Sequence, residues 1–207
     1  MTWDVLSIIG TIAFAVSGAI IAMEEEYDIL GVYILGIVTA FGGGAIRNLL
    51  LGVPMSALWE QGMLFQIALL SMTAVFLFPH NLLKHWNKWG NFFDAIGLAA
   101  FAIQGALFAA KMGHPLSASI VAAVLTGSGG GIIRDLLAGR KPTVLKEEIY
   151  AVWAIIAGGA VGLGIAKSPF ELYSLCVIIV VLRMCSYMYS WSLPIKSLGV
   201  NKRNTSL

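Results

Sequence analysis

Seven long apolar stretches dominate this 207-residue chain, and each is close to the length that a helix needs to cross a membrane. A membrane-spanning helix requires roughly 20 mostly apolar residues, whereas a strand of a membrane barrel is about half as long and alternates polar with apolar residues. The pattern therefore predicts an all-α membrane protein with seven transmembrane helices. They are expected at about residues 5–22, 29–50, 57–78, 92–110, 116–138, 149–166 and 170–191.

Charged residues are too few to cover a water-facing surface. They make up 12% of the chain, against about a quarter in soluble domains, while 58% of the residues are hydrophobic. This composition excludes a soluble enzyme, a disordered chain and a small disulfide-stapled module. A net charge of +2 gives no reason to expect a nucleic-acid partner. The chain contains no H-E-x-x-H motif and no phosphate-binding loop, so neither an enzyme nor a cofactor is expected.

The basic residues of the loops divide unequally between the two sides of the predicted bundle. Lys111 and Lys167 lie on the side of the N-terminus. The other side carries Lys84, Lys88, Arg140, Lys141, Lys146, Lys196, Lys202 and Arg203. Because basic loops stay in the cytoplasm, we expect a multi-pass protein of the inner (plasma) membrane, with the N-terminus outside and the C-terminus inside. An anchor against membrane lipids is expected where basic and aromatic residues alternate, at Lys84, Trp86, Lys88 and Trp89.

The chain also repeats itself at an offset of 87 residues. From Ile8 to Gly52, 17 of 45 residues are identical to the residue 87 positions later, with no insertion. Each repeat holds three predicted helices, an odd number, so the second copy starts from the opposite side of the membrane. This arrangement is an inverted repeat, a design that places equivalent segments face to face near the middle of the bilayer.

The repeat defines the expected organisation of the whole chain. We expect one membrane domain over residues 1–207. It consists of a first repeat at about 5–78, a second at about 92–166, an unpaired seventh helix at about 170–191 and a cytoplasmic tail at 192–207.

A glycine triplet recurs in both repeats, as Gly42–Gly44 and Gly129–Gly131. Each glycine disfavours a helix interior by about 1 kcal/mol relative to alanine, so a kink or a short unwound segment is predicted at each triplet. Carbonyl groups released there could coordinate a monovalent cation. The alternative is tight helix packing, because glycines let two backbones approach closely.

An arginine follows each triplet within the apolar stretch, Arg47 in the first repeat and Arg134 in the second. Such a residue is costly in the bilayer unless it is paired or its side chain reaches the membrane surface. Asp135 lies about 100° around the helix from Arg134, so we expect it to face elsewhere. If the repeats face each other, Arg47 pairs with Asp135, and Arg134 lies opposite the neutral Asn48.

Other polar residues of the apolar stretches have two possible roles. They could line a wet path, or they could satisfy the backbone and neighbouring helices. These residues are Ser17, Thr39, Gln104, Thr126 and Ser128. Asp94 is expected to cap the start of its helix, and Arg183 to extend toward the membrane surface.

These motifs resemble the prokaryotic trimeric intracellular cation channel family, which is also catalogued as a glycine-transporter-type domain that occurs twice per chain. The resemblance extends from Asp4 to about Pro194. Its carriers are the 10–19 and 94–106 stretches, both triplets with their arginines, and the Trp191–Pro194 end.

The resemblance implies a homotrimer with a pore in each protomer that conducts monovalent cations, chiefly potassium. The second and fifth helices would bend at the triplets, with Arg47, Arg134 and Asp135 beside the pore. The family has an acid after both arginines, whereas this chain has Asn48 in the first repeat. A secondary transporter for glycine or a similar small zwitterion is the alternative function, because inverted repeats and broken helices suit it equally well.

Overall fold

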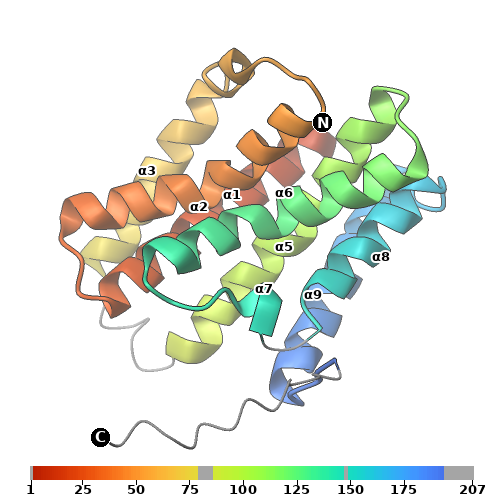
Figure 1. Cartoon of the computed structure of the whole chain (residues 1–207). Coiled ribbons are helices and arrows are strands. Elements are labelled where there is room, and N and C mark those ends of the chain that lie inside the picture. The colour runs from red at the N-terminus through yellow and green to blue at the C-terminus, as the bar shows by residue number, and fades with distance from the viewer. Residues whose placement is uncertain (1, 79–85, 147–148, 194–207) are drawn as a thin grey trace, which may run out of the picture.

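A computed structural model of the chain describes residues 2–78, 86–146 and 149–193, and all regular structure in these ranges is helical (Figure 1). The long helices are α1 (Thr2–Glu24), α2 (Ile29–Leu50), α5 (Trp86–Lys111), α6 (Leu116–Leu137) and α9 (Pro169–Met188). The shorter ones are α3 (Gly62–Leu77), the single turn α7 (Thr143–Lys146), α8 (Ala151–Gly162) and the 3-10 turn η1 (Met55–Leu58).

Each of the seven apolar stretches contains one helix. Five of these helices, α1, α2, α5, α6 and α9, are long and apolar enough to cross a membrane, and α3 and α8 are apolar but shorter. The predicted bounds of α2 agree with the structure at both ends, whereas α5 starts at Trp86 rather than near residue 92. The chain is therefore an all-helical, multi-pass membrane protein.

The helix ends follow from local sequence. The Asp28 carboxylate accepts a hydrogen bond from the Gly31 N–H at 2.8 Å and so caps the start of α2. At the start of α9, Ser168 and Glu171 form a capping box. Four helices are followed by a glycine with positive φ, the conformation that ends a helix at low cost. These glycines are Gly52, Gly113, Gly139 and Gly164.

Helices α1, α2, α5 and α6 pack together at the centre of the molecule, as Figure 1 shows. Helix α3 packs against α1 and α2, whereas α8 packs against α5 and α6, and α9 against α5. The core accordingly divides into two apolar clusters, one around α1, α2 and α3 and the other around α5, α8 and α9. The third helix of each repeat, α3 or α8, thus packs on the outside of the four central helices.

Two phenylalanines interlock α1 with α5. The rings of Phe14 and Phe101 meet edge to face, with centroids 5.3 Å apart. Each ring occupies the space where a side chain would stand on the other helix, since Phe101 covers Gly10 and Phe14 covers Gly97. The two pairs are related by the 87-residue offset, so one contact is used twice.

Some predictions fall on residues that the structure does not describe. The expected cytoplasmic tail lies outside the described residues from position 194 onward. So do four basic residues that predicted the orientation, namely Lys84, Lys196, Lys202 and Arg203.

Candidate functional site

The glycine triplets lie within continuous helices. Helix α2 is uninterrupted through Gly42–Gly44, and α6 through Gly129–Gly131. The unwound segment predicted from glycine's low helix propensity is therefore wrong. Packing against the neighbouring helix outweighs that propensity, which is a weak preference. Coordination of a cation by the triplet carbonyls stays a prediction, and those carbonyls also belong to a helix.

The middle glycine of each triplet marks a close approach of α2 and α6. A Cβ atom on Gly43 would lie closer than 3.0 Å to the carbonyl oxygen of Thr126, and one on Gly130 would lie equally close to the carbonyl oxygen of Thr39. Thr39 and Thr126 are themselves related by the repeat offset. Only glycine at both positions lets the two backbones touch, so tight helix packing accounts for the middle glycines.

The last glycine of each triplet lies beside an arginine. A Cβ on Gly44 would be 3.8 Å from Nη2 of Arg47, and a Cβ on Gly131 would be 3.7 Å from Nη2 of Arg134. Each guanidinium therefore folds back along its own helix. Both residues are only 5% exposed, so the alternative in which their side chains extend to the membrane surface is wrong.

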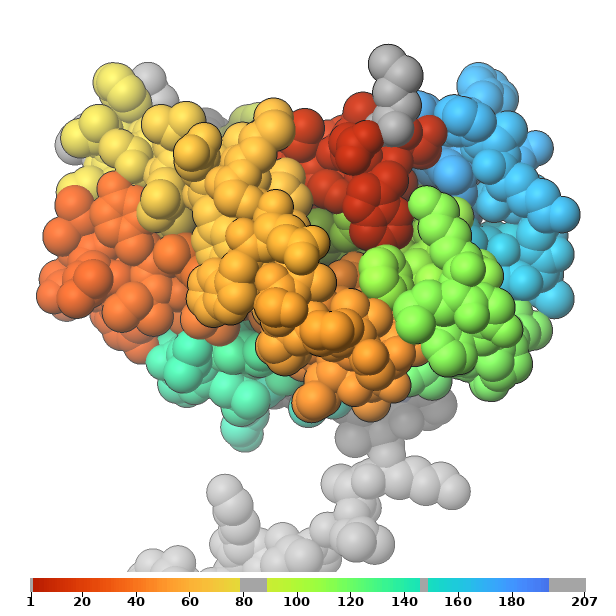
Figure 2. Space-filling model, turned by 90° about the horizontal axis from the view of Figure 1, so that it is seen from above, coloured from red at the N-terminus to blue at the C-terminus, as the bar shows by residue number. Residues whose placement is uncertain are grey.

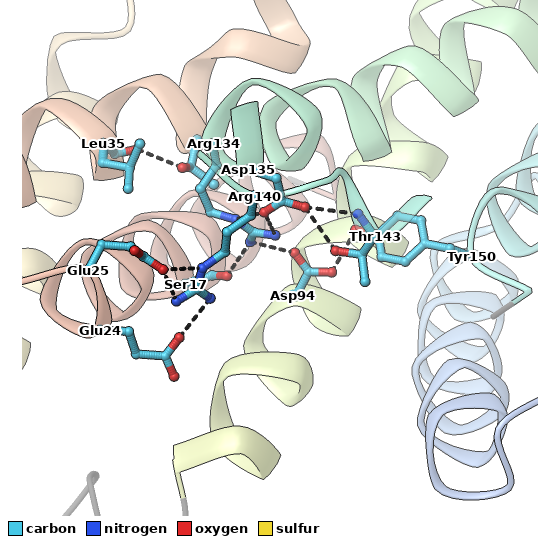
Figure 3. A network of polar contacts seen from close by, with 11 residues as sticks. Ser17, Glu24, Glu25, Leu35, Asp94, Arg134, Asp135, Arg140, Thr143 and Tyr150 are labelled. Atoms are coloured by element: carbon cyan, nitrogen blue, oxygen red, sulfur yellow. Dashed lines mark hydrogen bonds and ion pairs between the residues drawn. The ribbon is translucent and has the colours of Figure 1, made fainter. Parts of the chain in front are cut away.

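Arg134 is held by acidic and hydroxyl groups from three helices (Figure 3). Its Nη1 donates to Asp94 Oδ1 at 2.7 Å and to Ser17 Oγ at 2.6 Å, and its Nε donates to Asp135 Oδ1 at 2.9 Å. The expectation that Asp135 faces away from Arg134 is wrong, because the helical angle fixes only the Cβ directions. The long arginine side chain spans the remaining separation.

Both carboxylates are anchored at their second oxygen as well. Tyr150 donates its hydroxyl to Asp94 Oδ2 at 2.6 Å. Thr143 donates its N–H and its hydroxyl to Asp135 Oδ2 at 3.0 and 2.8 Å. Asp94 is the ninth residue of α5, so its expected role as a helix cap is wrong. The cluster of Arg134, two carboxylates and their donors is called the acidic cluster below.

A further buried arginine lies behind this cluster. The guanidinium carbon of Arg183 lies 4.7 Å from the centre of the Tyr150 ring. Arg183 is 1% exposed, so the expectation that its side chain reaches the membrane surface is wrong. A cation over a tyrosine face is favourable in such a dry setting.

Arg47 has a different environment from its counterpart Arg134. Its Nε and Nη2 donate to Asn48 Oδ1 at 3.1 and 2.8 Å, and its guanidinium carbon lies 4.4 Å from the centre of the Phe108 ring. No carboxylate of the described residues pairs with it, so the predicted ion pair with Asp135 is wrong. Asp135 is already taken by the arginine next to it.

The 87-residue offset also relates the surroundings of the two arginines. It places Ser7 opposite Asp94 and Gln104 opposite Ser17. Gln104 donates its amide to the Ser7 hydroxyl, which donates in turn to the Trp3 carbonyl at 2.9 Å. The first half therefore has neutral residues at both positions where the second half has acids, Asn48 for Asp135 and Ser7 for Asp94.

Each arginine lines a polar cavity, and the two cavities differ in place and lining. A cavity of about 340 Å³, the inner cavity, contains Arg134 and Arg140 together with Ser17, Asp94, Asp135 and Thr143. A cavity of about 320 Å³, the outer cavity, is lined by Trp3, Ser7, Arg47, Asn48, Gln61 and Gln104, among others. Figure 2 looks at the end of the molecule with the outer cavity, where a hollow lies between the start of α1 (red) and the η1 segment (orange).

These two cavities are separate and share none of their described lining residues. A narrow extension of about 20 Å³ continues from the outer cavity past Gly44 and Arg47 as far as Phe101 and Thr126. The middle glycines and the interlocked phenylalanines lie in this central region, so the structure holds two polar cavities with a packed barrier between them.

Hydroxyl groups of the central helices are buried and engaged with the backbone. Thr39, Thr126 and Ser128 each donate to the carbonyl four residues earlier, at 2.6 Å. The backbone role considered for them is therefore present. Thr126 in addition lines the narrow extension.

A salt bridge closes the rim of the inner cavity. Arg140 donates to Glu24 Oε2 at 2.8 Å and to Glu25 Oε1 at 2.5 Å, and thereby joins the α6–α7 connection to the end of α1. Burial alone would lower the pKa of Arg140, but hydrogen bonds to both glutamates outweigh it and raise that pKa.

Four residues of the two arginine sites escaped the sequence prediction: Ser7, Phe108, Thr143 and Tyr150. Phe108 and Tyr150 read as ordinary apolar residues of helices, and Thr143 as part of a loop. The 87-residue offset could have identified Ser7 as the equivalent of Asp94, because both lie one position before the matched stretch.

Comparisons with known proteins agree on one family. A family model described as Glycine transporter matches residues 4–80 and 91–166, one match in each repeat. The UPF0126 membrane protein YvgT of Bacillus subtilis is 78% identical over 197 residues, which cover 95% of this chain and 98% of that protein.

Solved structures with the same fold are also similar in sequence. A prokaryotic TRIC channel in 0.5 M KCl has a TM-score of 0.84 and 32% identity, over 92% of this chain and 98% of that one. The TRIC trimeric intracellular cation channel orthologue from Rhodobacter sphaeroides has a TM-score of 0.82 and 32% identity, over 90% and 97%.

The family model covers most of the chain, the B. subtilis relative matches it almost from end to end, and the resemblance drawn from the triplet–arginine motifs is confirmed. The chain belongs to the glycine-transporter (UPF0126) family, and it has the fold of the TRIC channels.

Proposed function

We propose that this protein is a channel for monovalent cations, chiefly potassium, with one pore inside each protomer of a homotrimer. The observation that carries the proposal is the pair of separate polar cavities, each of which contains one of the two buried arginines. The fold supports it, because proteins with this fold and about a third of its residues in common are TRIC cation channels.

The proposed path passes the crossing of α2 and α6, since α6 lines the inner cavity and α2 lines the outer one. It begins in the inner cavity at the acidic cluster, passes the crossing at Gly43 and Gly130, and continues through the narrow extension into the outer cavity at Arg47. The structure corresponds to a closed path, because the crossing is packed. Opening requires α2 and α6 to separate or to bend at their triplets, where few side chains resist the movement.

We further propose that all seven apolar helices cross the membrane and that the two halves form an inverted repeat. The 16 residues of α3 give a helix about 24 Å long, which spans most of a ~30 Å hydrocarbon layer. The reciprocal contacts of Phe14 with Gly97 and of Phe101 with Gly10 are those expected of two halves related by a two-fold axis. The basic loops favour a cytoplasmic C-terminus in the inner membrane.

Preference for cations is assigned to the inner cavity. Arg134 is outnumbered there by Asp94 and Asp135, which leaves the acidic cluster with one net negative charge. The lining of the inner cavity is neutral as a whole, because Glu24, Asp94 and Asp135 balance Arg134, Arg140 and Lys141. The negative charge of the acidic cluster therefore attracts cations locally, within the cavity. Arg47 at the other end has the opposite effect.

Electrical recording from the purified protein in a planar bilayer with a KCl gradient tests this proposal. We expect discrete currents that reverse near the potassium equilibrium potential. Silence at all voltages, with protein shown to be folded and inserted, would contradict the channel.

The second candidate is a carrier for glycine or a similar small zwitterion. The packed crossing between the two cavities favours it, because alternating access needs a barrier that is closed at either end in turn. The family model is described as Glycine transporter. Saturable uptake of labelled glycine into proteoliposomes without channel currents would establish the carrier.

A further inference from the structure

We infer that the outer cavity is a binding site for a small monovalent anion, held by the guanidinium of Arg47. The inference concerns a ligand of opposite charge to the proposed cation, and it stands whether the protein is a channel or a carrier. It is carried by an uncompensated buried charge, by the free edge of its guanidinium and by the polar lining of the cavity.

The charge of Arg47 is buried and lacks a carboxylate. The residue is 5% exposed, and its partners are the Asn48 amide oxygen and the Phe108 ring. A buried charge is strongly unfavourable unless an opposite charge or several hydrogen bonds compensate for it. At the equivalent place, Arg134 has two carboxylates. The first half of the molecule thus lacks the negative side chains that pair with the arginine in the second half.

One edge of this guanidinium is available to a ligand. Nε and Nη2 of Arg47 bond to Asn48 Oδ1, whereas Nη1 makes no hydrogen bond with the described residues. Arg47 lines the outer cavity and its narrow extension. An anion in the outer cavity can therefore accept from Nη1 in a charge-assisted hydrogen bond, the stronger class of hydrogen bond.

The rest of the cavity suits a small ion. Asn48, Gln61 and Gln104 line it, and each carries an amide that can donate. Its volume of about 320 Å³ far exceeds the ~10–15 Å³ that one water needs, so an ion fits with part of its hydration shell. Asp4 also lines the cavity, and Lys111 interacts with it electrostatically.

Ligand-dependent melting of the purified protein in discs of neutral lipid tests the inference. The protein is titrated at constant ionic strength with formate or bromide, each replacing the bulky sulfonate MES. Glycine, which has no net charge, is added at a constant concentration of MES. We expect a saturable rise in Tm of about 2–4 °C with formate or bromide, since a ligand that binds only the folded state stabilises it. A larger response to glycine than to formate would identify an amino-acid carboxylate as the ligand.

Two variants locate the site. Arg47→Gln removes the charge, and Asn48→Asp keeps the arginine but supplies the carboxylate that Asp135 supplies to Arg134. Both are expected to weaken anion binding at least tenfold, and Asn48→Asp should also melt higher than the parent without anion. Arg140→Gln, a cation of the other cavity, is the control and should bind as the parent does.

Two results would overturn the inference: no saturable response of the parent to any of the three probes, or an equal response in the parent, Arg47→Gln and Asn48→Asp. Neither depends on conduction, because melting is measured without a membrane potential. A failure of the anion site and a failure of the channel are therefore distinguishable.

Discussion

The two repeats present the same scaffold with different charges. In both, a glycine triplet meets the facing helix, an arginine folds back over the last glycine, and a phenylalanine fills the place of a missing side chain in the other half. The second half surrounds its arginine with Asp94 and Asp135. The first half offers Arg47 an amide and an aromatic ring.

This difference shows that backbone geometry and electrostatics can change independently. The close approaches depend on glycines, which both halves retain. The charge depends on two positions, where the first half has the neutral Asn48 and the smaller, neutral Ser7 and the second half has Asp135 and Asp94. A duplicated scaffold can therefore keep its packing while one half gains a different affinity for ions. Four predictions test this separation, from the largest expected effect to the smallest.

Asp94→Asn should have the largest effect. It leaves the buried Arg134 with one carboxylate. It also replaces the charged acceptor of the Tyr150 hydroxyl by a neutral amide. Breaking a buried ion pair by removing one partner costs about 3–5 kcal/mol in the free energy of unfolding. Chemical denaturation in detergent measures the loss. Ser7→Ala, at the equivalent position, is the matched control with an expected cost of about 1 kcal/mol; equal losses would show that the halves do not differ energetically.

Replacing the middle glycines tests whether the packing is shared. Gly43→Ala and Gly130→Ala each place a Cβ against a threonine carbonyl, and this overpacking should cost about 1–3 kcal/mol and alter conduction. The matched controls are Gly44→Ala and Gly131→Ala, where the new Cβ has room and helix propensity improves by about 1 kcal/mol. Thermal melting together with bilayer recording distinguishes the pairs. If alanine at a middle glycine changed neither stability nor conduction, the α2–α6 contact would not be part of the barrier.

Asn48→Asp makes the first half resemble the second. The new carboxylate should neutralise Arg47 and raise the preference for cations, by on the order of 1 kcal/mol, or about fivefold in the permeability ratio of K⁺ to Cl⁻. Reversal potentials in asymmetric KCl report this ratio. Asp135→Asn is the reciprocal change and should lower it. An unchanged ratio in both variants would place these residues outside the conduction path.

The rim salt bridge should contribute least. Arg140, Glu24 and Glu25 are all partly exposed, and exposed ion pairs contribute about 0.2–1 kcal/mol. Glu25→Gln should therefore lower Tm slightly in dilute buffer and not at all in high salt, where the charges are screened. Glu26→Gln, the neighbouring acid in the same turn, is the control. An effect that persists in high salt would point to packing instead of charge.

The fold was largely predictable from the sequence, because hydrophobic length determines where membrane helices lie. The predicted and observed bounds of α2 coincide, and those of α6 differ by one residue. The largest errors fell on the starts of α5 and α3. The start of α5 contains the polar Asn87, Lys88 and Asn91, which hydropathy excludes from a span although they continue the helix.

The sequence predicted which arginines form the two sites, but it did not predict which residues they contact. The repeat identified Arg47 and Arg134 and their equivalence. Their partners depended on where flexible guanidinium groups end, which helical periodicity does not determine. The pairing of Arg134 with its own neighbour Asp135 and with Asp94 of α5 is a tertiary result. The same applies to the triplets, whose helical state depends on the facing backbone and not on glycine's own preference.

The unequal surroundings of the two arginines have a consequence for current through the proposed path. A conduit whose two halves are geometric equivalents would pass ions equally well in either direction if its electrostatics matched. Here a cation meets the net negative charge of the acidic cluster in one half and Arg47 without a paired carboxylate in the other. The protein would therefore act as a rectifier, with a current–voltage relation that is asymmetric even in identical solutions, because only one of the two arginines lies between carboxylates.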